Sequence, residues 1–74
     1  MAKEYLVVLF PRARRVKING QFMGMTNRKL ELEGGRYEVA LGQPFNFTPE
    51  TVEIDLRNTS SLTPMTVEFM EGSK

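Results

Sequence analysis

The feature that most constrains this chain is the alternation of apolar and polar residues between Val16 and Leu41. Three runs in this stretch alternate with a period of two residues, as side chains do on the two faces of a β-strand. The glycine-containing dipeptides Asn19-Gly20 and Gly34-Gly35 separate the runs, and such dipeptides are typical of tight turns between neighbouring strands. The stretch therefore predicts a small antiparallel β-module.

Similar patterns predict short strands along most of the chain, over residues 5–10, 15–18, 21–23, 29–33, 36–41, 51–57 and 65–69. No window has the period of a helix. About six or seven short strands at this spacing are typical of an all-β sandwich. We therefore predict an all-β fold, a small antiparallel β-sandwich with an Ig-like or transthyretin-like two-layer architecture.

The Gly34-Gly35 dipeptide predicts how the residues of the two strands beside it pair. A two-residue turn at Gly34-Gly35 places Leu32 opposite Tyr37 on the core side of a hairpin. The same register places Glu31 opposite Glu38 on the solvent side, which is a mildly unfavourable pair.

The length of 74 residues allows one domain, which we predict to span residues 1–74 with an ordered core from about 4 to 70. The chain has no Cys and no His. It therefore lacks disulfides, thiolate nucleophiles and the commonest general base and metal ligand. No cofactor and no metal site are expected. The formal net charge of +1 gives no overall argument for nucleic acid or membrane.

The sequence leaves the location of the protein open. No signal peptide is visible, and the apolar run Leu6–Phe10 is too short for a membrane span. We expect a cytoplasmic protein if the chain is complete, and an envelope or extracellular module if it is part of a longer protein.

Several motifs in a fixed order resemble the PEGA domain family. The matching positions are Val16-x-Ile18-Asn19-Gly20, Gly24-x-Thr26, Leu30-x-Leu32-x-x-Gly35-x-Tyr37-x-Val39, Phe47-x-Pro49 and Val52-x-Ile54. The chain departs from the family where Pro11-Arg12-Ala13-Arg14 replaces the tetrapeptide that names it, and where Thr26-Asn27 replaces Thr-Pro. The resemblance implies a small β-sandwich module, common in bacterial and archaeal surface proteins. It implies a binding or structural role without catalytic residues.

The acidic residues of the strands are the candidates for chemistry, namely Glu31, Glu33, Glu38, Glu53 and Asp55. Two carboxylates can act as acid and base in glycoside hydrolysis. All of these side chains occupy outward positions of alternating strands, where water surrounds them and no pocket shapes a transition state. We therefore predict solvated strand faces, no catalytic residues and no enzymatic activity.

A basic cluster provides a candidate anion contact, made by Arg12, Arg14, Arg15 and Lys17. Arginine forks suit phosphate groups, so the cluster fits nucleic acid or another anionic polymer. No aromatic residue is interleaved with the arginines in the sequence, and Phe22 is the nearest. A solvated basic loop is the competing interpretation.

Two apolar features provide a candidate interface, made by Tyr5, Val7, Leu9, Phe45 and Phe47. The strand over residues 5–10 is apolar on both faces, so its outer face is either covered by loops or buried against a second copy or another domain. Phe45 and Phe47 either contact a partner or a sugar, or close the open end of the sandwich.

These observations predict a non-catalytic binding or structural interaction module. The expected partners are a protein or a second copy of the chain, with a carbohydrate or envelope polymer also compatible. The alternative is a small protein that binds nucleic acid or another anionic polymer through the basic loop at residues 12–17.

Overall fold

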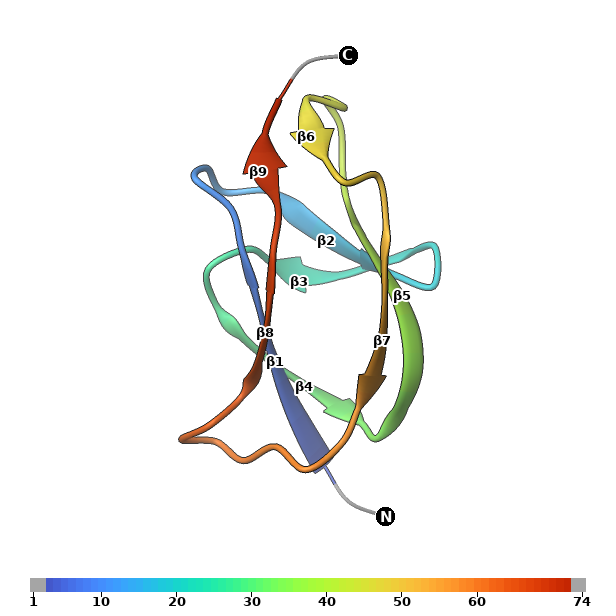
Figure 1. Cartoon of the computed structure of the whole chain (residues 1–74), viewed down its shortest axis with the longest axis vertical. Helices are drawn as coiled ribbons and strands as arrows, with labels where there is room; N and C mark the ends of the chain where they lie inside the picture. Colours follow the sequence, from blue (N-terminus) through green and yellow to red (C-terminus); the bar gives the residue numbers. More distant parts are fainter. Residues whose placement is uncertain (1–2, 73–74) are drawn as a thin grey trace.

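The computed structural model describes residues 3–72, and this part of the chain is all-β (Figure 1). Its strands are β1 (Lys3–Leu9), β2 (Arg15–Ile18), β3 (Gln21–Met25), β4 (Lys29–Glu33), β5 (Gly35–Leu41), β6 (Phe47–Thr48), β7 (Val52–Leu56), β8 (Met65–Glu68) and β9 (Met70–Glu71). The predicted fold class is confirmed. The two-residue strands β6 and β9 were not expected from the sequence.

The strands form two larger sheets and one small one. One sheet has the order β4-β1-β8, the second has the order β3-β2-β5-β7, and β6 pairs with β9. The pairs are antiparallel apart from β1 and β8, which run parallel. The sequence did not indicate this parallel pair, which forms because the chain crosses from β7 back to the first sheet and enters β8 in the direction of β1.

The core lies between the two larger sheets, and both contribute to a single apolar cluster. Its buried members are Leu6, Val8, Phe10, Val16, Ile18, Leu32, Val39, Leu41, Phe47, Leu56, Val67 and Phe69. Alternation predicted inward positions in β2, β4 and β5. The structure confirms this for Val16, Leu32 and Val39, which are all buried. Each fully buried side chain of this kind contributes about 1.5–3 kcal/mol.

The Asn19-Gly20 turn joins β2 to β3 as predicted. Both residues have positive φ, 52° and 86°, as a type I′ turn requires. The turn is also fastened to β5, because the Glu38 amide donates to Asn19 Oδ1 at 2.8 Å and the Asn19 amide donates to the Glu38 carbonyl at 2.9 Å. The hairpin therefore has a fixed position on its sheet.

The hairpin predicted at Gly34-Gly35 is wrong. Strands β4 and β5 belong to different sheets, so Leu32 lies opposite Glu4 of β1, whereas Tyr37 lies opposite Ile54 of β7. Of the two glycines only Gly35 has a positive φ, 153°, so the pair cannot form a type I′ turn. Alternation specified which side chains face the core, and it did so without specifying the neighbouring strand.

The end of the chain was predicted to fray from Glu71 onwards. Instead, β9 pairs with β6 through Phe47 opposite Glu71. In Figure 1 this small pair lies at the end of the long axis nearest the C-terminus. Residues 73 and 74 of the predicted tail lie outside the described residues.

A buried carboxylate ties β1 to the connection between β7 and β8. Glu4 is buried, and its Oε1 accepts hydrogen bonds from the amide and the hydroxyl of Thr59 at 2.9 and 2.6 Å. These two bonds lower the pKa of Glu4 because they favour its charged form. The Thr59 hydroxyl also accepts a bond from the Tyr5 amide at 2.8 Å.

Candidate functional site

The loop that follows β1 is held by a buried threonine. The hydroxyl of Thr26 donates to the Arg12 carbonyl at 2.8 Å and accepts from the Arg14 amide at 2.9 Å. The Thr26 amide donates to the Arg14 carbonyl at 2.8 Å. Thr26 therefore fixes the backbone that carries the first two arginines of the basic cluster. The sequence placed Thr26 in a connecting loop and gave no hint of this role.

The next residue holds the beginning of the same loop. Asn27 has a φ of 64°, a left-handed conformation that asparagine tolerates. Its side chain donates to the Phe10 carbonyl at 2.8 Å and accepts from the Phe10 amide at 3.2 Å, and its own amide donates to the Val8 carbonyl at 2.7 Å. The loop is thus held at both ends by Thr26 and Asn27.

Arg12 and Arg14, two of the four predicted anion contacts, have partners within the protein. Arg12 forms an ion pair with Glu71, which raises the pKa of Arg12. Arg14 donates from Nη1 to the Pro44 carbonyl and to Asn46 Oδ1, both at 2.9 Å. These arginines fasten the loop to β9 and to residues 44–46, so they are poorer candidates for binding a ligand.

Arg15 and Lys17, the other two, share one aromatic ring on the outer face of their sheet. The guanidinium carbon of Arg15 lies 4.1 Å from the centroid of the Phe22 ring, and Lys17 Nζ lies 5.6 Å from it. Phe22 is 46% exposed. Among residues 3–72 neither cation has an ion-pair partner. The three-dimensional structure therefore places an aromatic residue between the basic ones, although the sequence does not.

The position of Phe22 depends on a buried glycine. A methyl group at Gly42 would lie 3.0 Å from Cε1 of Phe22, which is tighter than ordinary packing. The Gly42 amide donates to the Arg15 carbonyl at 2.9 Å, which holds the glycine beside β2. The ring of Phe22 therefore leans across β2 into space that only a glycine leaves free.

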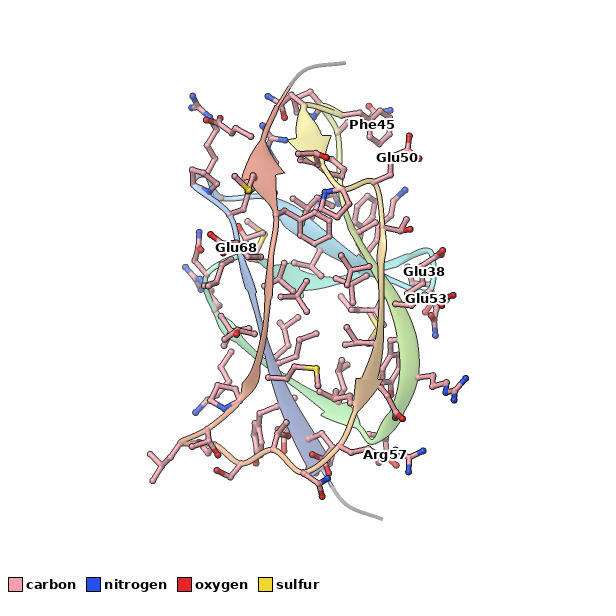
Figure 2. All side chains as sticks on the ribbon, in the orientation of Figure 1. Glu38, Phe45, Glu50, Glu53, Arg57 and Glu68 are labelled. Atoms are coloured by element: carbon pink, nitrogen blue, oxygen red, sulfur yellow. The ribbon has the colours of Figure 1, made fainter. Side chains whose placement is uncertain are left out.

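Between the β2–β3 hairpin and residues 42–45 lies a shallow groove of about 820 Å³. We call it the hairpin groove and define it by Arg15, Lys17, Phe22, Gly42 and Phe45. Phe45 is 61% exposed, and Figure 2 shows it near the C-terminal end of the molecule with Glu50 close by in the view. The groove therefore combines two cations with two exposed aromatic rings.

The two phenylalanines of the predicted interface have different environments. Phe47 is 5% exposed and packs edge-on against Phe10 and Phe69, with ring centroids 6.3 and 5.7 Å apart. It closes the end of the core, as one of the two interpretations predicted. Phe45 lies beside Phe47, with ring centroids 6.2 Å apart, and stays exposed.

The outer face of β1 is less exposed than the sequence suggested. Tyr5 and Val7 are half-buried, and Leu9 is 37% exposed. β1 is the central strand of its sheet, so both of its edges are paired. Lys29 of β4 also reaches over the Tyr5 ring, with Nζ 5.6 Å from its centroid. This face therefore offers only a small apolar area for self-association.

Three of the five acidic candidates lie on the other half of the sheet that carries the hairpin groove, where Glu38, Glu53 and Asp55 line a hollow of about 370 Å³. The other two, Glu31 and Glu33, lie on β4 in the first sheet. Glu38 lies opposite Glu53 and Arg36 lies opposite Asp55. The predicted pair of Glu31 with Glu38 does not form, because these residues lie in different sheets. Figure 2 shows Glu38 and Glu53 projecting to the same side, away from the body of the molecule. Within residues 3–72 no three His, Cys, Asp or Glu side chains are placed to hold a metal ion.

The fold and the groove define a class of protein, a small all-β domain with a basic and aromatic groove on one sheet. Comparison with family models, with curated proteins and with solved structures found no match to this chain. The resemblance to PEGA domains therefore stays a prediction. The described residues contain no helix that is long and apolar enough to cross a membrane.

Proposed function

We propose that this protein is a non-catalytic binding module that holds an anionic polymer in the hairpin groove. The observation that carries the proposal is the shared use of the exposed Phe22 ring by Arg15 and Lys17. The proposal keeps the polymer-binding roles considered from the sequence and narrows the contact from the basic residues 12–17 to Arg15 and Lys17 on β2.

Stacking on a ring prepares a guanidinium for an anion. The stacked group uses its face for the aromatic contact, and the in-plane N–H donors stay available for a bidentate bond to an acidic group. Lys17 adds a second positive charge on the same face of β2, and cross-strand pairing sets it beside Phe22. Two neighbouring cations of this kind suit successive acidic groups along a chain.

The surroundings of the acidic residues support a binding role without catalysis. Glu38 and Glu53 are exposed on a sheet face, and the chain has no His or Cys to serve as base or nucleophile. Contact with a protein, including a second copy through β1, has less support, because Tyr5 and Val7 are already half-buried.

The proposal is tested by measuring the binding of labelled polyphosphate, heparin and oligo(dT) by fluorescence anisotropy. We expect log K to fall linearly with log salt between about 50 and about 200 mM, because phosphate or sulfate neutralisation releases counterions. Arg15→Ala and Lys17→Ala should each weaken binding. Arg36→Ala is the matched control, since Arg36 is an exposed cation on the same sheet, opposite Asp55.

Two results would contradict the proposal. One is the absence of binding to all three polymers at low salt. The other is an equal loss of affinity in Arg36→Ala and Arg15→Ala, because the groove would then have no special role.

A further inference from the structure

We infer that the polymer in the hairpin groove is single-stranded nucleic acid, an inference that rests on the proposed function. Phe22 and Phe45 are 46% and 61% exposed, and both line the groove that Arg15 and Lys17 line. A site for acidic groups alone would need the cations and the Phe22 ring that supports Arg15, and would have no use for the exposed Phe45 ring.

Single strands match this combination of groups. Along a single strand, phosphates alternate with bases whose flat faces are free to stack. Non-specific single-strand sites in proteins accordingly combine cations along the backbone with aromatic side chains under the bases. In the hairpin groove Arg15 and Lys17 provide the cations, with Phe22 supporting Arg15, and Phe45 provides the exposed aromatic ring.

The same rings argue against the other anionic polymers. Polyphosphate has no apolar surface to place on Phe45, and heparin presents sulfated sugars in place of flat rings. A duplex keeps its base faces stacked on one another, so it offers the rings nothing unless it opens. Phe45 projects from the loop between β5 and β6 with most of its surface exposed, so an unpaired base can reach it.

The charge around the groove limits how much of the strand is bound. Glu50 lines the adjoining hollow together with Lys17 and Phe45, so the groove is bordered by an acidic residue at that end. The acidic half of the sheet lies beyond Lys17. We therefore expect contact with a few nucleotides, tolerance of different base sequences and modest affinity.

The test compares oligo(dT) of about ten nucleotides with an abasic oligonucleotide of the same number of phosphates, under the same low salt. The two probes differ only in their bases. We expect oligo(dT) to bind about tenfold more tightly, the effect of stacking one or two bases on aromatic side chains. This arm uses the unmodified protein, so it does not depend on the folding of a variant.

Two variants test whether Phe45 causes the difference in affinity between oligo(dT) and the abasic probe. Phe45→Ala should remove most of the preference for oligo(dT) over the abasic probe. Met70→Ala is the matched control, because Met70 is also 61% exposed and lies on β9, outside the groove. It should leave both affinities as they are.

The remaining outcomes separate this inference from the proposed function. Equal binding of oligo(dT) and the abasic probe, or tighter binding of heparin, polyphosphate or duplex DNA, would overturn the inference and leave an anion-binding groove. Failure of every polymer to bind would overturn both.

Discussion

The two halves of one sheet face differ in what surrounds their charges. In the half that holds the hairpin groove, Arg15 and Lys17 flank an aromatic ring and border a hollow. In the other half, Glu38 and Glu53 face each other across β5 and β7, with Arg36 and Asp55 next along the strands. These four residues line a smaller hollow of about 370 Å³, in which acidic groups outnumber the one cation. Both halves come from alternating strands, so the alternation itself does not distinguish a solvated face from a binding site.

The loops make the difference between the halves. The groove half is bordered by residues 10–14, which Thr26 and Asn27 hold, and by residues 42–46, to which Arg14 donates two hydrogen bonds. The acidic half is held by the ladder between β5 and β7 and is bordered by the short Asn19-Gly20 turn, which bonds to Glu38. A site is thus built where side chains from distant segments fix loops beside a strand, and the four predictions below test this difference.

The largest effect is expected for Thr26→Val, which keeps the shape of the side chain and removes its hydroxyl. The Arg12 carbonyl and the Arg14 amide would each lose a partner. We expect the free energy of unfolding to fall by about 2 kcal/mol, measured by urea denaturation. Thr66→Val, at an exposed position of β8, is the control. A loss no greater than in this control would show that the loop does not depend on Thr26.

The next effect concerns charge on the two halves. Lys17→Glu should weaken oligo(dT) binding about tenfold at low salt, because it removes one phosphate contact and adds repulsion. Glu53→Lys, on the acidic half, should strengthen binding about threefold, since it acts over a longer distance and is more strongly screened. Anisotropy titrations measure both. Equal effects of the two substitutions would mean that the polymer senses only net charge.

A smaller effect is expected for Gly42→Ala. The added methyl group would stand 3.0 Å from the Phe22 ring, so the ring must shift at a cost of about 1 kcal/mol. Proton chemical shifts of Phe22 and the affinity for oligo(dT) should both change. Gly72→Ala, where the nearest contact is an ordinary 3.4 Å to Thr48, should change neither. An unchanged ring signal in Gly42→Ala would show that this glycine does not position Phe22.

The smallest effect concerns Glu4, which lies in the other sheet. Its folded pKa is lowered from 4.5 by the bonds from Thr59, so its stabilising effect is present above the unfolded value and is lost as the pH falls through the folded pKa. Glu4→Gln should therefore be less stable than the unmodified protein at neutral pH, and the gap should narrow in acid. Urea midpoints at several pH values measure this.

The affinity for oligo(dT) is the control measurement for the Glu4 prediction. The affinity of Glu4→Gln for oligo(dT) at neutral pH should stay unchanged, because Glu4 does not line the groove. A stability gap that stays constant with pH would contradict the role assigned to the carboxylate.

The sequence predicted the core better than the connections. Alternation identified Val16 and Val39 as buried, and Asn19-Gly20 as a hairpin turn. The Gly34-Gly35 dipeptide gave the wrong partner for β4. Alternation could not correct this, because a period of two residues indicates the face of a strand and carries no information on its neighbour. The parallel pairing of β8 with β1 depends on a long connection that has no pattern of its own.

The site was predictable only in part. The sequence selected the four basic residues without separating their roles, because the partners that occupy Arg12 and Arg14 lie 59 and about 30 residues away and loops bring them close. The position of Phe22 beside Lys17 did have a signal, since a two-residue turn at Asn19-Gly20 sets these residues opposite each other. Nothing in the sequence indicated that Gly42 leaves space for the Phe22 ring.

The most direct test of the central claim is a titration of the ¹⁵N-labelled protein with oligo(dT), followed by amide chemical shifts. If the hairpin groove binds the polymer, the shifts will concentrate at Arg15, Lys17, Phe22, Gly42 and Phe45, and will be small on β7 and on the outer face of β1. Shifts centred on Tyr5 to Leu9 or on the acidic half, or no shifts at low salt, would contradict the account.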